Sequence, residues 1–408
     1  MPWNPHNLTV HSGAPHAIGA PVSHVAAFEG TQHVFHRALV GEDRPREGLV
    51  EIWWRPGETP PWDDLFANVS DDLRGFALWV ACHVVEAERT QHVFYPLGVG
   101  ELWWPRGGAV DAGNLCDQAG QPKLGGFGLA SHVFLAEETQ HVFFIAQGEI
   151  DGITVDGHVG ELWWRGSDKA QLADLTKRAG AAPVPEAASL ASHVVEGPFT
   201  AERSQHVFYH SGRDIIELSW GADAVTTPRN LTASSAGENE PAASTPASHV
   251  DPDGTHHVFY VADNAHIIEL TWQGENNPVA RDLTAHSTGI GPAPIAISAP
   301  TSHLFRREGT HHVYYVSQGN HLIELWWLPG DDPHHEDLTA QSGDTSLARA
   351  DTTPASHVFD QEGTQPSSTP RPPARSSNCG GSPDPHPPAR APHTPAPYTA
   401  TLVTLPIR

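Results

Sequence analysis

Few cysteines and few basic residues limit what this chain of 408 residues can be. Its three cysteines, Cys82, Cys116 and Cys379, are odd in number and widely spaced, so neither a disulfide framework nor a zinc site is indicated. Lys and Arg together number 23 against 48 Asp and Glu, and the resulting net charge of −25 repels phosphate backbones and anionic lipid heads. We therefore expect no nucleic-acid partner and no membrane insertion.

Long apolar segments are missing as well. No apolar run is long enough to span a bilayer, and the opening residues, MPWNPHNLTVHS, lack the basic and apolar regions of a signal peptide. The expected location is therefore cytoplasmic, or extracellular by a non-classical export route. Charged residues make up only 17% of the chain, and 37 Gly and 37 Pro leave little room for long helices. This composition favours an all-β protein rich in turns.

The chain contains instead a repeat of roughly fifty residues with four short segments. A Ser-His-Val-like triplet opens each repeat, with its histidine at His24, His83, His132, His193, His249, His303 and His357. A Thr-Gln-His-Val-aromatic segment follows, then an acid, an aliphatic residue and tryptophan, and finally Asp-Leu or Asn-Leu. Each segment is rich in β-branched and aromatic residues and is bounded by turn formers, which is typical of strands in hairpins.

Four strands per repeat predict a β-propeller, because a single four-stranded sheet of this kind must bury both faces against neighbouring sheets. The blade starts lie near 23, 82, 131, 192, 248, 302 and 356. We therefore predict an all-β, seven-bladed propeller with four-stranded antiparallel blades over residues 1–365. Residues 1–12, in which Asn7-Leu8-Thr9 matches the fourth segment, are expected to supply an outer strand that closes the ring.

The last blade is predicted to be incomplete. After Gln365 the pattern stops, and residues 366–408 form a Pro-rich tail expected to be disordered and to have no place in a blade. A frameshift explains the break: deleting one base from codons for Gln-His-Val-Phe-Tyr gives Gln-Pro-Ser-Ser-Thr, the sequence at 365–369, and the shifted frame over 376–381 reads Ile-Glu-Leu-Trp-Trp. Without its second and third strands, the seventh blade should leave the ring gaping between blades six and one.

Strand alternation separates two kinds of tryptophan in the third segment. The third residue after the acid shares a face with aliphatic residues and is assigned to the core between blades: Trp54, Trp104, Trp164, Trp220, Trp272 and Trp327. The second residue after the acid lies on the acid's own face and varies, which suits a position facing a ligand. It is tryptophan in four repeats, at Trp53, Trp103, Trp163 and Trp326, and Ser219 or Thr271 in two.

One glutamate in each repeat stands in mid-strand among apolar residues: Glu51, Glu101, Glu161, Glu217, Glu269 and Glu324. A buried carboxylate needs a partner, and a histidine of the neighbouring strand is the natural one: His33, His92, His141, His206, His257 and His312. Whether the two meet depends on a strand register that a single residue would change. Two interpretations stay open, a structural hydrogen bond repeated in every blade and a polar clamp for a ligand hydroxyl between blades.

The first-segment histidines are expected near the axis, where they pack and hydrogen-bond to the next blade. A metal-binding ring is disfavoured, because Ser-His-Val has no ligand spacing and seven residues form too wide a ring for one ion. No acid pair or nucleophile stands out from the repeats, so no catalytic residue is assigned. We expect no metal and no cofactor.

The blade pattern is similar to that of fungal fucose-specific lectins and bacterial propeller lectins. The likeness lies in His257-Val258-Phe259-Tyr260, a short turn, and Ile267-Ile268-Glu269-Leu270-Thr271-Trp272. The resemblance implies sugar sites between blades, where the glutamate accepts hydroxyl hydrogen bonds and an indole stacks on the sugar. The family places Arg before the Val-aromatic pair, whereas this chain has His, so the resemblance implies sugar binding without implying fucose.

The leading interpretation is a non-catalytic, multivalent lectin that binds glycans or glycoconjugates through up to six weak, equivalent sites. The alternative is a structural or protein-interaction propeller whose His–Glu pairs are internal. A propeller hydrolase is a third interpretation, disfavoured because the repeats show no single distinctive site. The sequence leaves the oligomeric state open.

Overall fold

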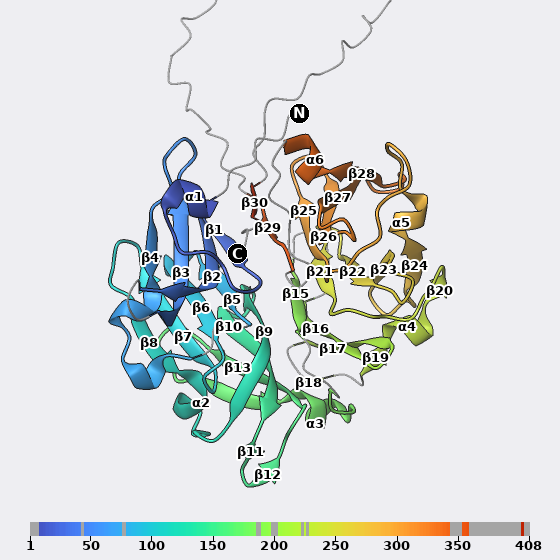
Figure 1. The fold of residues 1–408 in the computed structure, drawn as a ribbon. Coiled ribbons are helices and arrows are strands. Elements are labelled where there is room, and N and C mark those ends of the chain that lie inside the picture. Colours follow the sequence, from blue (N-terminus) through green and yellow to red (C-terminus); the bar gives the residue numbers. More distant parts are fainter. Residues whose placement is uncertain are drawn as a thin grey trace, which may run out of the picture.

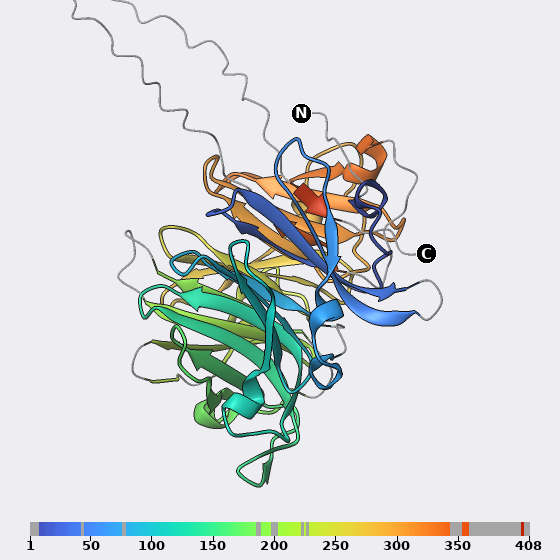
Figure 2. The same ribbon diagram turned by 90° about the vertical axis from the view of Figure 1, so that its left-hand side faces the viewer.

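The computed structural model of this chain describes residues 8–41, 45–75, 79–184, 189–196, 203–221, 224–225, 228–342, 353–358 and 401–403. Six antiparallel sheets, the blades, follow one another in chain order around a common axis (Figure 1). Figure 2 shows the sheets of the first blades from the side, from blue through teal to green. The prediction of an all-β propeller with four-stranded blades is confirmed. Among the described residues no helix has the length and apolar character needed to cross a membrane.

Blades 1 to 3 are built from four strands that pair in chain order. Blade 1 consists of β1 (Val22–Ala26), β2 (Thr31–Val40), β3 (Arg46–Trp54) and β4 (Trp62–Asp64). Blade 2 consists of β5 (Ala81–Val85), β6 (Thr90–Tyr95), β7 (Gly100–Pro105) and β8 (Asp111–Asn114). Blade 3 consists of β9 (Gly125–Phe134), β10 (Thr139–Gln147), β13 (Val159–Trp164) and β14 (Gln171–Asp174), with a side hairpin of β11 (Glu149–Ile150) and β12 (Ile153–Thr154).

Blades 4 to 6 repeat this plan with small additions. Blade 4 consists of β15 (Ala191–Val195), β16 (Ser204–Ser211), β17 (Asp214–Gly221), β18 (Ala224–Val225) and β19 (Arg229–Asn230). Blade 5 consists of β21 (Ala247–Val250), β22 (Thr255–Val261), β23 (Ile267–Gln273) and β24 (Val279–Asp282), to which β20 (Ala236–Gly237) adds in parallel. Blade 6 consists of β25 (Thr301–Phe305), β26 (Thr310–Val316), β27 (Leu322–Trp327) and β28 (His334–Asp337).

The first strands of the blades line the axis and contact one another in order, from β1 through β5, β9, β15, β21 and β25. A seventh inner strand, β29 (Ala355–His357), lies between β25 and β1 and contacts both (Figure 1). The prediction of a gap between blades six and one is therefore wrong at the axis. Hydrogen bonds hold this strand on both sides: Ser356 Oγ lies 3.3 Å from Thr301 Oγ1 of blade 6, and His357 Nε2 lies 3.0 Å from Gln32 Oε1 of blade 1.

Six blades are complete, so a full count of seven blades is not confirmed. At the seventh position, the described residues place β29 paired with β30 (Thr401–Val403) and with no other strand. The expectation that no residue after 365 joins a blade is thus wrong for this short segment. Its Thr-Leu-Val sequence favours a strand, and β29 offers it an open edge. The rest of the predicted disordered tail, from 366 to 400 and from 404 to 408, lies outside the described residues.

The fourth repeated segment is the end of a strand followed by a short helix. These helices are α1 (Leu8–Ser12), α2 (Leu115–Gln118), α3 (Leu175–Ala179), α4 (Leu231–Ser234), α5 (Leu283–His286) and α6 (Leu338–Ser342), while blade 1 is followed by the 3₁₀ turns η1 (Leu65–Asn68) and η2 (Asp71–Leu73). The Asp or Asn caps the helix: Asp282 Oδ1 accepts from Ala285 N at 2.8 Å. The leucine that follows is buried.

The N-terminal segment follows the same rule, so the prediction of an outer strand within 1–12 is wrong for Leu8–Ser12, which is α1. Leu8 is buried in one cluster with Val34, Ile52 and Trp54 of blade 1. It therefore covers the face of blade 1 that turns toward the seventh position. The segment still helps to close the ring, but as a helix.

The blades pack through aromatic side chains. In each pair of successive blades, the aromatic residue of one second strand contacts the invariant tryptophan of the next blade: Phe35–Trp104, Phe94–Trp164, Phe143–Trp220, Phe208–Trp272 and Phe259–Trp327. All six invariant tryptophans are at most 9% exposed. The assignment of these tryptophans to the core between blades is confirmed.

Candidate functional site

Strand register places each glutamate beside a histidine. In blade 1, His33 is directly opposite Trp53 and Phe35 is opposite Glu51. Because side chains alternate between faces, His33, Glu51 and Trp53 lie on one face of the sheet, with the histidine and the acid on a diagonal. The other five blades have the same register. This face turns toward the next blade along the chain, since Phe35 lies on it and contacts Trp104.

All six predicted His–Glu pairs form. In every blade the histidine Nδ1 lies 2.7 to 2.8 Å from the glutamate Oε1. The pairs are His33–Glu51, His92–Glu101, His141–Glu161, His206–Glu217, His257–Glu269 and His312–Glu324. The expectation that each buried acid has a histidine partner is confirmed.

The second ring nitrogen of these histidines is also engaged in five blades. A hydroxyl two residues earlier in the same strand lies 2.6 to 2.9 Å from Nε2. The hydroxyls belong to Thr31, Thr90, Thr139, Ser204 and Thr310. The glutamates are 3 to 6% exposed. The pairs are therefore enclosed within the blades, and the sequence analysis overlooked the Thr or Ser that completes each chain of hydrogen bonds.

In the blade 1 pair, burial shifts both pKa values toward the uncharged forms. Burial, with a contribution from Asp63, raises the pKa of Glu51 to about 8, and burial lowers the pKa of His33 to about 4. In blade 5 burial opposes the charged form of His257, but hydrogen bonds to Asp251 and Glu269 outweigh it and raise its pKa to about 9.

The residues around the pair divide the blades into two kinds. In blades 1, 2, 3 and 6 the half-buried tryptophan directly opposite the histidine is Trp53, Trp103, Trp163 or Trp326. In blades 4 and 5, where Ser219 and Thr271 replace it, an arginine of the fourth strand stands opposite the acid: Arg229 across from Glu217 and Arg281 across from Glu269.

Arg229 connects two blades. Its guanidinium NH1 lies 3.8 Å from Glu217 Oε2, and its Cζ lies 5.6 Å from the ring centre of Trp272 in blade 5. The sequence analysis did not single out either arginine. The available signal was their place immediately before Asn-Leu or Asp-Leu, in the two repeats that lack the second tryptophan.

The first-strand histidines join neighbouring blades, as predicted. In blades 1 to 5 and in β29, Nε2 bonds to a second-strand residue of the next blade at 2.8 to 3.1 Å: His24–Gln91, His83–Gln140, His132–Gln205, His193–His256, His249–His311 and His357–Gln32. The last of these bonds attaches β29 to blade 1. The bonds between first-strand histidines and the next blade therefore continue across the seventh position.

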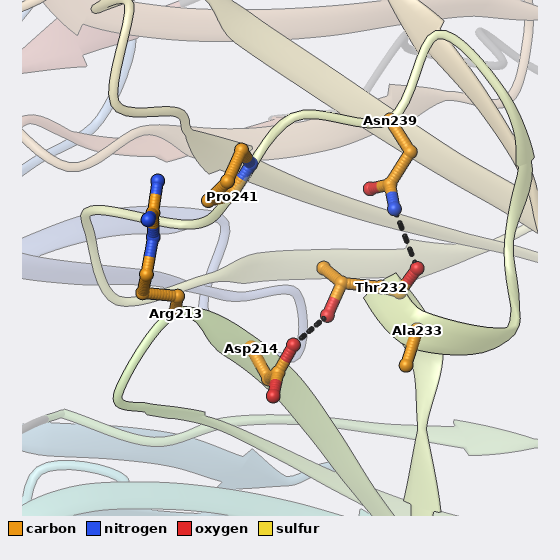
Figure 3. Close-up of a pocket in the computed structure, with 6 residues that line it drawn as sticks. All are labelled: Arg213, Asp214, Thr232, Ala233, Asn239 and Pro241. Atoms are coloured by element: carbon orange, nitrogen blue, oxygen red, sulfur yellow. Dashed lines mark hydrogen bonds between the residues drawn. The ribbon is translucent and has the colours of Figure 1, made fainter.

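A hollow of about 310 Å³ lies away from the His–Glu pairs, where the start of β17 meets α4 and the loop leading to blade 5. It is lined by Arg213, Asp214, Thr232, Ala233, Asn239 and Pro241 (Figure 3). The Thr232 hydroxyl donates to Asp214 Oδ1 at 2.8 Å, and Asn239 Nδ2 donates to the Thr232 carbonyl at 2.6 Å. None of the predicted site residues lines this hollow.

No family model and no curated protein matches this chain. Among solved structures, similarity is found to AofleA from Arthrobotrys oligospora, at 16% identity over 78% of this chain and 86% of that one, with a TM-score of 0.44. The fucose-specific lectin from Aleuria aurantia is 16% identical over 68% and 82%, with a TM-score of 0.43. SapL1 lectin is 13% identical over 80% and 96%, with a TM-score of 0.44. Fucose-binding lectins, the family that the blade motifs resemble, are thus among the solved structures similar to this chain.

Proposed function

We propose that this chain is a non-catalytic carbohydrate-binding protein with repeated sites between blades. The observation that carries the proposal is the shared face described above. On it, each blade aligns a carboxyl group with either an indole or a guanidinium and turns them toward the next blade. A sugar offers hydroxyls on its edges and apolar C–H groups on its faces. Carboxyl and guanidinium groups bond to hydroxyls, and an indole covers an apolar face.

In this proposal the two kinds of blade make different contacts. In blades 1, 2, 3 and 6 the half-buried indole is the contact surface, and the enclosed His–Glu pair holds the strand that presents it. In blades 4 and 5 the arginine provides the polar contact, and in blade 4 the enclosed Glu217, with Oε2 3.8 Å from the guanidinium, holds it in place. Glycans or glycoconjugates are thus the proposed partners, held by several weak sites whose strength adds through avidity.

A second function, a protein-interaction or structural scaffold, is favoured by one observation. The His–Glu pairs are buried, and in five blades both histidine nitrogens are already bonded within the blade. Groups satisfied in this way stabilise the sheets without any ligand.

A glycan array probed with the full chain distinguishes the two functions. We expect binding to a defined set of glycans, weakened at least several-fold by Trp103→Ala and by Arg229→Ala. Arg106→Ala is the matched control, because Arg106 is an exposed residue in the turn that follows the same strand as Trp103. An array without signal for a folded chain contradicts the proposal and favours the scaffold. Binding unchanged by Trp103→Ala and Arg229→Ala contradicts the assignment of the sites.

A further inference from the structure

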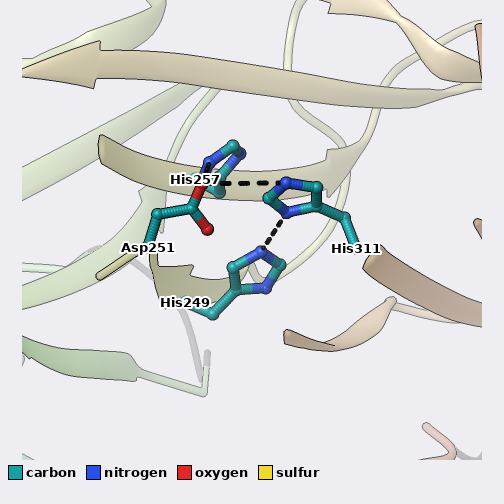
Figure 4. Close-up of side chains that lie close together, drawn as sticks. All are labelled: His249, Asp251, His257 and His311. Atoms are coloured by element: carbon teal, nitrogen blue, oxygen red, sulfur yellow. Dashed lines mark hydrogen bonds and ion pairs between the residues drawn. The ribbon is translucent and has the colours of Figure 1, made fainter. Parts of the chain in front are cut away.

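Blades 5 and 6 contain a cluster of side chains that the carbohydrate site does not use. His249 at the axis, Asp251 just after β21, His257 on β22 and His311 on β26 of blade 6 point toward one another (Figure 4). One ligand atom from each of the four residues lies within 4.8 Å of the others. The cluster therefore spans the interface between two blades.

Two substitutions distinguish this interface from the other repeats. At the position of Asp251 the other blades carry apolar residues: Ala26, Val85, Phe134, Val195 and Phe305. At the position of His311, blades 1 to 4 carry glutamine: Gln32, Gln91, Gln140 and Gln205. Aspartate and histidine are good ligands for a borderline metal ion such as zinc, whereas the apolar side chains and glutamines that they replace are not.

The hydrogen-bond partners of His257 also differ from those of its counterparts. The Thr255 hydroxyl accepts from Gln273 Nε2 at 2.8 Å, instead of bonding to the ring as the equivalent hydroxyls do. Nε2 of the buried His257 therefore has no hydroxyl partner among the described residues and faces the carboxylate of Asp251, with Oδ2 at 3.4 Å. This nitrogen points into the cluster, where a metal ion can take the place of its proton.

The separations suit a small tetrahedral ion. Asp251 Oδ2 lies 3.4 Å from His257 Nε2 and 3.7 Å from His311 Nε2. Ligand atoms about 2.0–2.2 Å from a central zinc ion are about 3.3–3.6 Å apart in a tetrahedron, so these two separations lie in and just above the required range. His249 Nε2 lies 3.0 Å from the other nitrogen of His311, Nδ1, and gives up this hydrogen bond when it turns to ligate the ion.

The support around His257 is that of a metal ligand. Its Nδ1–H donates to Glu269 Oε1 at 2.8 Å, which fixes the ring and leaves Nε2 to bind. A carboxylate behind a ligating histidine is the common arrangement at zinc sites, where it orients the ring and makes it more basic. In blade 5 the His257–Glu269 pair would therefore also orient a metal ligand.

We infer that His249, Asp251, His257 and His311 form a structural site for a divalent transition-metal ion, best suited to Zn²⁺, that joins blades 5 and 6. Three imidazoles and one carboxylate complete a tetrahedral set with no position left for substrate, as in sites that stabilise folds. Binding displaces any proton on the ligating nitrogens into solvent. The expectation of no metal rested on the seven axial histidines as one wide ring, whereas this site combines axial and second-strand residues of two blades.

The test compares metal uptake by the full chain and by variants that restore the residues of other blades. Asp251→Val and His311→Gln introduce side chains that the equivalent positions already accommodate. His256→Gln is the matched control, because His256 belongs to the analogous group of His193, His206 and His256, which has no carboxylate. Each purified, metal-free protein is dialysed against Zn²⁺ and against Co²⁺, and its melting temperature is measured with and without Zn²⁺.

We expect the unaltered chain to show the intense visible absorption of tetrahedral cobalt(II), and a melting temperature several degrees higher with Zn²⁺. The His256→Gln variant should behave in the same way. Asp251→Val and His311→Gln should lose both signals and one equivalent of tightly held ion, while melting cooperatively without metal. Two results overturn the inference. Metal uptake that is unchanged in Asp251→Val and in His311→Gln would place the bound ion elsewhere, for example on the tail histidines His386 and His393. Uptake lost only in His256→Gln would place it on the group of His193, His206 and His256.

Discussion

At the scale of single residues, the invariant tryptophans are the main contacts between blades. Trp272 is 4% exposed, stacks on His256 at a centroid distance of 4.7 Å, and meets the edge of Phe208 in the preceding blade. Trp272→Ala should lower the free energy of unfolding by ~3–5 kcal/mol, because it leaves a large cavity between blades. Urea unfolding at neutral pH measures the loss. Thr271→Ala, next to it on the half-buried face, should change stability by less than ~0.5 kcal/mol.

A loss below ~1 kcal/mol in Trp272→Ala would mean that the interface between blades 4 and 5 does not depend on the indole. If Thr271→Ala lowered the free energy of unfolding as much as Trp272→Ala does, the two faces of β23 would contribute equally to stability. That result would contradict the packing described.

The residues of the site were predictable to different degrees. The sequence predicts the His–Glu pairs because an acid among apolar residues needs a partner, and one histidine recurs at a fixed place in the adjacent strand. It does not predict whether the pairs are enclosed, because enclosure depends on the register and on the next blade. Arg229 escaped notice because its equivalent recurs only in one other repeat, at Arg281. Thr31 recurs as Thr or Ser in all six repeats, but its role depends on a contact within the strand that the repeat alone does not specify.

At the scale of elements, the Asp-Leu-Thr motif joins a strand, a cap and a helix. In blade 5, Asp282 Oδ1 caps α5 and its Oδ2 accepts from His266 Nδ1 at 2.7 Å, while Thr284 Oγ1 accepts from Ile267 N at 2.9 Å. Leu283 is fully buried. The motif therefore connects helix α5, through the Asp282 cap, to the start of β23, through His266 and Ile267. These bonds fix the outer edge of the blade.

Asp282→Ala should lower the free energy of unfolding by about 1–2 kcal/mol, since the cap and the histidine bond are both lost. Asp282→Asn is the control: its amide oxygen can still cap the helix, so we expect a smaller loss. Thermal or urea unfolding of the two variants makes the comparison. Equal losses would mean that the cap itself contributes little.

The sequence predicted the fourth segment as a strand, and the structure makes it a strand end plus a helix. A helix of four or five residues shows no 3.6-residue periodicity, so hydrophobic patterning cannot reveal it. The cap residue was the available signal, because Asp and Asn favour the position before a helix. The strands themselves were predictable, since alternation and turn residues recur in six copies.

At the scale of the whole molecule, the buried axial histidines make stability depend on pH. Burial, with the charge of neighbouring histidines, lowers the pKa of His24, His132 and His357 to about 3, so these rings are neutral in the folded state. Unfolded, a histidine titrates near pH 6.5. Because the folded pKa is depressed, the full stability is present above about pH 6.5 and is lost as the pH falls toward about 3.

Each such histidine should therefore cost about 1.4 kcal/mol of stability per pH unit in that window. Between pH 6 and 4, we expect His24→Gln to reduce the slope of unfolding free energy against pH by about 1.4 kcal/mol per pH unit. This reduction corresponds to one proton fewer taken up on unfolding. Urea unfolding at several pH values measures both slopes. Carboxyl titration affects both chains equally and cancels in the difference. Parallel curves for the two chains would mean that His24 is not held neutral.

Within the described part of the chain, the two blades that flank the seventh position lack the aromatic partners found between the other blades. Five invariant tryptophans contact an aromatic residue of the preceding blade, whereas Trp54 follows the seventh position and is the most exposed of the six, at 9%. On the other side, Tyr314 lies in a small cluster with Leu322 and Leu338. The inner strand β29 and helix α1 cover part of these faces but do not replace a blade.

We predict that a chain with the reading frame restored by one base inserted at the codon of Pro366 completes the ring. The restored His-Val-aromatic strand would bring an aromatic ring to Trp54, and the restored Ile-Glu-Leu-Trp-Trp strand would bring an indole to Tyr314. Trp54 is 9% exposed and Tyr314 is fully buried, so the gain comes from the aromatic contacts and from the added strands that complete the sheet, and not from these two rings leaving water. The restored chain should therefore melt higher, more cooperatively and as a monomer in size-exclusion chromatography. As a control, replacing the last tryptophan of the restored strand by alanine should return the melting temperature toward that of the present chain. Equal melting of the restored and present chains would mean that β29, β30 and α1 already supply the closure, and that the seventh blade adds nothing to it.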